Sequence, residues 1–85
     1  MTIYVSNLDF YANNADLKSL FIPYGEVNSA MIAKDSMFKR SRGFGFVEMP
    51  EEAAGYEAIA KLNGLLIDGK ALIVDISKPK KRMYL

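Results

Sequence analysis

The sequence predicts an α+β domain in which two helices pack on one face of a four-stranded antiparallel sheet. Its 85 residues, 51% of them hydrophobic, are enough for one hydrophobic core and too few for two. Apolar residues recur with the period of a strand, then of a helix, then of a strand, and this order occurs twice. Glycines alternate with phenylalanines in residues 42–49. This pattern is expected in a strand whose glycine side is covered closely by helices, so that the phenylalanines face outward.

Residues 3–8 are predicted to form the first strand, because β-forming residues alternate between two faces there. Ile3 and Val5 share the predicted inner face, and Tyr4 lies on the outer face. A helix is expected next, since Asn13 can cap its first turn and apolar residues follow at helical spacing.

Pro23 and Gly25 are expected to end this helix. Residues 27–33 then return as a strand that places Met31 on the outer face, although its inner residues fit strict alternation only with one short break. The polar and basic segment 35–41 is predicted to be an exposed loop that leads to the next strand.

The strand predicted over residues 42–49 is the centre of the second unit. A helix follows, since Pro50 suits a helix start and small and apolar residues recur on one face up to Leu62. Gly55 within it is expected to allow close approach to the sheet, where Gly43 and Gly45 leave space.

The last part of the chain is predicted to form a small hairpin and a final strand. Asp68 and Gly69 are a tight-turn pair that closes the hairpin begun at residues 65–67. Residues 71–77 follow as a strand with Asp75 and Ser77 on the outer face.

This arrangement leaves one face of the sheet bare. Its predicted occupants are Tyr4, Met31, Phe44 and Phe46, with Arg42, Asp75 and Ser77 near them. Exposed flat rings beside an arginine form a surface on which nucleic-acid bases can stack. An exposed patch of this kind usually marks a contact site.

The composition argues against several classes of function. Without cysteine or histidine, the chain lacks thiolate and imidazole ligands for zinc, thiol nucleophiles and the commonest general base. We therefore expect no enzyme activity, no metal and no cofactor. No apolar run could span a bilayer and the first residues do not resemble a signal peptide, so a cytoplasmic protein without membrane contact is expected.

The positive charges are few but clustered. The formal net charge is only +1, yet basic residues gather in residues 34–42 and 78–82. The candidate phosphate contacts are Lys39, Arg40, Arg42, Lys78 and Lys80.

Two of these segments resemble the sequence motifs of a known family. Residues 42–47, Arg-Gly-Phe-Gly-Phe-Val, resemble the eight-residue motif of the RNA recognition motif family, and residues 3–8 resemble its six-residue motif. The resemblance covers nearly the whole chain and implies a ferredoxin-like βαββαβ sandwich. It also implies that Tyr4, Phe44 and Phe46 stack on bases of single-stranded RNA.

The resemblance extends to small single-domain RNA-binding proteins of bacteria, with residues 1–79 as the domain and residues 80–85 as a short basic tail. Two positions depart from the family pattern. Lys39 stands where a glycine is frequent, and Met49 stands where an aromatic residue is usual, at a position predicted to face the core.

Other functions remain open from the sequence. Single-stranded DNA is an alternative partner, since stacking does not read the 2′-hydroxyl. A protein-interaction module on the same fold is a second alternative, although no particular protein partner is indicated. An acylphosphatase-like enzyme has little support, because residues 9–14 contain no arginine or glycine to hold phosphate.

Overall fold

The structure is a computed structural model that describes residues 1–77 of the chain. Lys78, Lys80 and the predicted tail 80–85 lie outside the described residues, so the predicted domain boundary stays a prediction. Within the described part, neither helix is long and apolar enough to cross a membrane.

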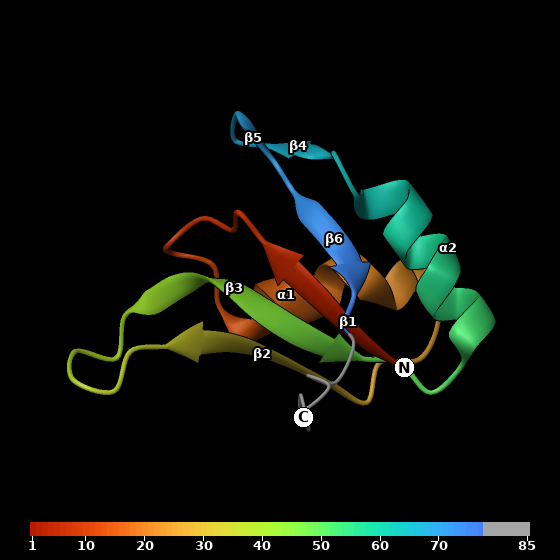
Figure 1. The fold of residues 1–85 in the computed structure, drawn as a ribbon, viewed down its shortest axis with the longest axis horizontal. Helices are drawn as coiled ribbons and strands as arrows, with labels where there is room; N and C mark the ends of the chain where they lie inside the picture. The colour runs from red at the N-terminus through yellow and green to blue at the C-terminus, as the bar shows by residue number, and fades with distance from the viewer. Residues whose placement is uncertain (78–85) are drawn as a thin grey trace, which may run out of the picture.

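The large sheet has four antiparallel strands in the order β2-β3-β1-β6, and a two-stranded hairpin β4-β5 precedes β6 (Figure 1). Both helices cover the face of this sheet that carries Ile3, Val5 and Val47. The predicted α+β, ferredoxin-like architecture is therefore confirmed. The elements are β1 (Thr2–Ser6), α1 (Asn14–Phe21), the 3-10 helix η1 (Ile22–Tyr24), β2 (Ser29–Lys34), β3 (Ser41–Glu48), α2 (Glu52–Leu62), β4 (Leu66–Ile67), β5 (Lys70–Ala71) and β6 (Ile73–Ile76).

Helix α1 begins at the predicted cap. The Asn13 side chain accepts a hydrogen bond from the Asp16 N–H, and the Asp16 carboxylate accepts one from the Asn13 N–H. Leu17 and Phe21 are buried on its inner face. The α-helix ends at Phe21, close to the predicted end. Pro23 lies in the following 3-10 helix η1, and Gly25 comes directly after it.

All the predicted strands differ from the observed ones in their bounds, and the differences are larger than one residue in three of them. β1 ends at Ser6, because Asn7 adopts a φ of 61° that a strand does not accommodate. β2 begins at Ser29, so that the buried Val27 lies before the strand and no break within the strand is needed. The predicted strand 71–77 is divided, since β5 pairs with β4 whereas β6 pairs with β1.

Gly55 was predicted to bring α2 close to the sheet in space left by Gly43 and Gly45. The close approach is confirmed, since a Cβ at Gly55 would meet Met1 and lie 3.6 Å from Ile3 Cδ1 on β1, but the other two glycines lie elsewhere. A Cβ at Gly45 would meet the Met31 carbonyl oxygen on β2 and lie 3.1 Å from Leu17 Cδ2. Gly43 has a φ of +79°, beside an irregularity in the β2–β3 register.

Candidate nucleic-acid interface

Three aromatic rings form a cluster on the bare face of the sheet. Tyr4 on β1 lies opposite Phe46 on β3, and Phe44 lies two residues earlier on β3. The ring centroids are 5.8 Å apart for Tyr4 and Phe44, 5.6 Å for Tyr4 and Phe46, and 6.1 Å for Phe44 and Phe46. Such tilted and edge-to-face contacts stabilise the rings against one another, so the ring cluster is ordered before any ligand binds.

The ring cluster is open to solvent. Phe46 is 39% exposed, and Tyr4 and Phe44 are half-buried. On the opposite face of the same strand, Val47 is fully buried. The predicted orientation of β3 is therefore confirmed, with phenylalanines toward solvent and small and aliphatic residues toward the helices.

Arg42 and Met31 flank the ring cluster. The Arg42 guanidinium carbon lies 5.8 Å from the Phe44 ring centroid, a cation–π distance, and the side chain is exposed. Met31 lies opposite Phe46 in the β2–β3 register and is 63% exposed. Both lie on the face where the sequence predicted them, and together they add a charge and a polarisable apolar side chain to it.

The β6 side of the face is mixed in polarity. Asp75 lies opposite Tyr4 and is exposed, and its Oδ1 accepts a hydrogen bond from the Ile76 N–H at 2.7 Å. Ser77 is half-buried, and its N–H donates to the Thr2 carbonyl oxygen. Ile73, 53% exposed, extends the apolar surface on this strand but was not among the predicted site residues.

Asp35 organises the loop between β2 and β3. Its carboxylate accepts hydrogen bonds from the N–H groups of Met37, Phe38 and Arg40. These N–H groups, that of Phe38 first, hold the pKa of Asp35 below its ordinary value despite partial desolvation, and the Arg42 charge contributes. Lys39 has a φ of 57°, a left-handed conformation that glycine adopts at a lower cost than a residue with a side chain.

The predicted site residues fall into two groups. Tyr4, Met31, Arg42, Phe44, Phe46, Asp75 and Ser77 lie on the strands of the open face or at their ends. Lys39 and Arg40 lie in the exposed loop beyond the end of β2, where Arg40 is 5.3 Å from the Phe38 ring centroid. Lys78 and Lys80 lie outside the described residues.

Near Arg40 and Arg42, at the end of the sheet, lie three exposed side chains that were not among the predicted site residues: Phe10, Tyr11 and Lys70. Phe10 and Tyr11 are 65% and 93% exposed, and the Lys70 ammonium lies 5.2 Å from the Phe10 ring centroid. The signal available in the sequence was two adjacent aromatic residues in a polar segment that fits neither a strand nor a helix pattern.

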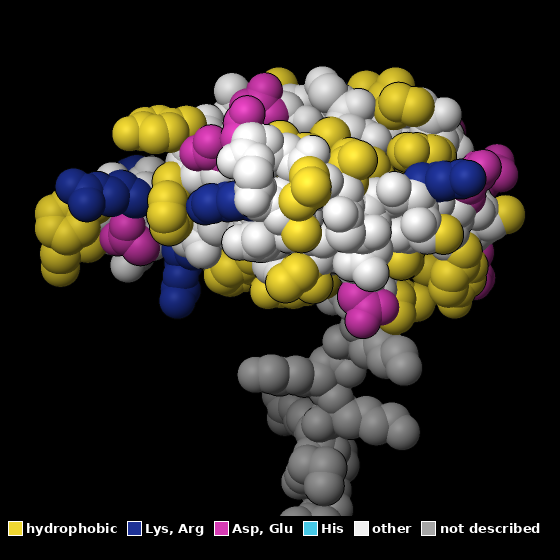
Figure 2. Space-filling model, turned by 90° about the horizontal axis from the view of Figure 1, so that it is seen from above, with side chains coloured by type: hydrophobic (Ala, Val, Ile, Leu, Met, Phe, Trp, Pro, Cys, Tyr) yellow, Lys and Arg dark blue, Asp and Glu magenta, His cyan; other side chains and the backbone are white. Residues whose placement is uncertain are grey.

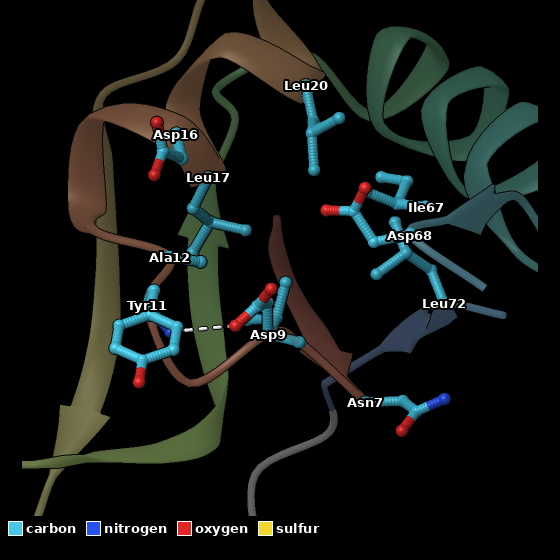
Figure 3. Close-up of a pocket in the computed structure, with 11 residues that line it drawn as sticks. Asn7, Asp9, Tyr11, Ala12, Asp16, Leu17, Leu20, Ile67, Asp68 and Leu72 are labelled. Carbon is cyan, nitrogen blue, oxygen red and sulfur yellow. Dashed lines mark hydrogen bonds between the residues drawn. The ribbon is translucent and has the colours of Figure 1, made fainter. Parts of the chain in front are cut away.

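A separate cavity of about 290 Å³ lies between α1 and the β4–β5 hairpin (Figure 3). Its walls are apolar, with Leu17 and Leu20 from α1 and Leu72 before β6. Two of the carboxylates that line it form local hydrogen bonds. Asp9 accepts one from the Tyr11 N–H, and Asp16 accepts one from the Asn13 N–H in the α1 cap. Among residues 1–77, no group of three or more acidic, cysteine or histidine residues could hold a metal ion.

Comparison with known proteins gives matches over almost the whole chain. The family model described as RNA recognition motif matches residues 3–73. The chain is 46% identical over 81 residues to the "Putative RNA-binding protein RbpD" of Nostoc sp., covering 95% of this chain and 86% of that protein. It also matches chloroplast proteins of plants, of whose length it spans only 20% to 34%.

Solved structures agree with the fold. The crystal structure of RNA binding protein PG1 superposes with a TM-score of 0.90 at 40% identity, covering 96% of this chain and 99% of that one. A Sxl-lethal protein/RNA complex superposes with a TM-score of 0.89 at 29% identity, covering 94% of this chain and 48% of that one. The resemblance drawn from the two sequence motifs is therefore confirmed.

Proposed function

The chain belongs to the RNA recognition motif family, and on that premise we propose that it binds single-stranded RNA across the open face of the sheet. The observation that carries the proposal is the ring cluster of Tyr4, Phe44 and Phe46, which is ordered by its own contacts yet accessible to solvent. Every base has a flat face, so two or three successive bases of a flexible strand can stack on such a surface.

Basic side chains hold the phosphates in this mechanism. Arg42 lies beside the ring cluster, and Lys39 and Arg40 extend from the loop at the end of β2. Lys78 and Lys80 are further candidates from the sequence. Each stacked base contributes about 1–3 kcal/mol, but ordering of RNA and of long side chains offsets much of this, so affinity on the order of micromolar is expected.

The decisive experiment removes both phenylalanine rings. Phe44→Ala with Phe46→Ala should abolish binding to a random-sequence RNA pool in a fluorescence titration, while the circular dichroism spectrum stays that of the parent. Tyr56→Ala is the matched control, because Tyr56 is 53% exposed but lies on α2, away from the open face. If the double variant binds as the parent does, bases do not stack on these rings.

Salt dependence separates this function from the protein-interaction alternative. With about four phosphate contacts, log affinity for a single strand should fall with log salt at a slope near −3. An interface built on apolar burial would depend far less on salt. Titration of one selected sequence as RNA and as DNA then tests the alternative partner, single-stranded DNA.

The proposal includes a binding role without catalysis and a cytoplasmic location. The first is supported by the family match and by a sequence without cysteine or histidine. The second follows only from the sequence. Fractionation of cells that express the tagged protein would test the location, and RNA recovered intact after incubation would test the absence of cleavage.

A further inference from the structure

A groove lies at the end of the sheet, between the β1–α1 connection and the β2–β3 loop. Figure 1 shows that these two connections project from the same end of the sheet. The volume of the groove is about 720 Å³. One wall is formed by Phe10, Tyr11, Ala12 and Asn13, and the other by Lys34, Lys39, Arg40 and Ser41. The ring cluster on the sheet lines no part of this groove, so the groove is a separate surface.

The two walls have complementary chemistry for a nucleotide. One carries the exposed rings of Phe10 and Tyr11, and the other carries the cations Lys34, Lys39 and Arg40. No acidic residue lines the groove. Figure 2 shows basic side chains (dark blue) next to hydrophobic ones (yellow) at the end of the molecule where the β2–β3 loop projects. Rings for a base opposite cations for a phosphate are the two parts of a single-strand binding site.

Both walls are held by local hydrogen bonds. The Asp9 side chain accepts from the Tyr11 N–H at 2.9 Å (Figure 3), and the Asp9 carbonyl accepts from the Ala12 N–H at 3.0 Å. On the opposite wall, the Asp35 carboxylate accepts from the Arg40 N–H. The groove is thus formed before a ligand enters, which lowers the entropy lost on binding.

The groove continues toward the ring cluster. A smaller hollow of about 290 Å³ is lined by Tyr4, Phe44 and Arg42 and also by Phe10 and Lys70. Phe10 lines both spaces, and Lys70 lies over its ring. An RNA strand that leaves the ring cluster past Arg42 therefore meets Phe10, which borders the groove as well.

We propose that this groove is an additional nucleotide subsite that extends the RNA path beyond the sheet. A base stacks on Tyr11, and the adjoining phosphates lie between Lys34, Lys39 and Arg40. The inference rests on the proposed function, since it takes the ligand to be the same RNA strand. It adds Phe10, Tyr11, Lys34 and Lys70 to the binding surface, and it predicts that RNA longer than the ring cluster can hold binds more tightly.

The test compares two lengths of RNA. The probes are random-sequence RNA pools, one about three nucleotides long and one about eight, titrated against the full chain. Tyr11→Ala should weaken binding of the longer pool about tenfold and leave the shorter pool unchanged. For the longer pool, Lys34→Gln with Lys39→Gln should make the slope of log affinity against log salt less steep by about 1.4, the value for two phosphate contacts to a single strand.

Tyr56→Ala and Lys61→Gln on α2 are the matched controls, since both residues are exposed on the far side of the domain. If the groove variants bind the longer pool as these controls do, while Phe44→Ala with Phe46→Ala abolishes binding, the groove is no subsite and the proposed function stands. If the phenylalanine variant also binds as the parent does, both the function and the subsite are overturned.

Discussion

The two faces of β3 carry similar apolar residues but differ in what covers them. Val47 is fully buried beneath the helices, whereas its neighbour Phe46 is 39% exposed on the bare face. Phe46 is thus exposed although phenylalanine, like valine, belongs to the residue types most often buried. In this strand, apolar residues serve two purposes, and only position relative to the small residues distinguishes them.

Gly45 shows why the faces are arranged this way. Its missing side chain leaves room on the inner face for Leu17 of α1 and for the backbone of β2. A strand with phenylalanines turned inward would have to place those rings in the same space. The outward orientation of Phe44 and Phe46 is therefore a consequence of packing on the opposite face.

The largest expected effect contrasts an inner with an outer phenylalanine. Phe21→Ala removes a fully buried ring and should lower the free energy of unfolding by about 3–5 kcal/mol, which leaves little stability in a domain of this size. Phe46→Ala should lower it by about 1 kcal/mol, mainly through lost ring contacts. Urea unfolding followed by circular dichroism measures both, and equal losses would contradict the division between the faces.

The next effect separates the two glycines of β3. Gly45→Ala should destabilise by up to about 3 kcal/mol, because its Cβ would meet backbone atoms of β2, which cannot rotate away. Gly43→Ala should cost about 1–2 kcal/mol, since its nearest contact is an ordinary 3.7 Å but its φ of +79° disfavours a side chain. The same unfolding measurement applies. A larger loss at Gly43 than at Gly45 would mean that backbone conformation dominates over close packing.

Much of this arrangement follows from the sequence. Alternation in residues 3–6 and 42–49 divided the side chains between two faces of the sheet. The glycines at 43 and 45, together with the family motif, then indicated which face the helices cover. The cap of α1 was predicted from Asn13 for an equally local reason.

The rest depends on contacts that local patterns do not contain. The irregular β2–β3 register that accompanies the φ of Gly43 arises between two strands, and the groove arises between two connections far apart in the sequence. Tyr11 gave no periodic signal, and its position across the groove from Lys34 and Arg40 is visible only in the folded chain. The close approach of Gly55 to the sheet was predicted, but its neighbour Met1 was not, because Met1 lies outside any periodic pattern.

A smaller effect concerns a polar contact that joins α2 to the sheet. The Asn63 Oδ1 accepts a hydrogen bond from the Val74 N–H at 3.0 Å. Asn63→Ala should lower stability by about 1–2 kcal/mol, because the partly buried N–H of Val74 loses its partner. Asn63→Asp keeps an acceptor at this place and should restore most of the loss. If the alanine and aspartate variants are equally unstable in urea, the hydrogen bond is not the cause.

The smallest effect on stability is expected at the loop beside the open face, where Asp35 accepts from backbone N–H groups. Its folded-state pKa lies below the unfolded value, about 3.9 for aspartate, so its stabilisation is fully present above that pH and is lost as pH falls through the lowered pKa. The amide chemical shifts of Met37 and Phe38 should therefore titrate with a midpoint below 3.9 in an NMR series of decreasing pH. Asp35→Asn should remove this titration and loosen the loop, while unfolding in urea at neutral pH changes little. A midpoint at or above the unfolded value would mean that the carboxylate does not hold the loop, and that the wall formed by Lys39 and Arg40 is ordered by other contacts.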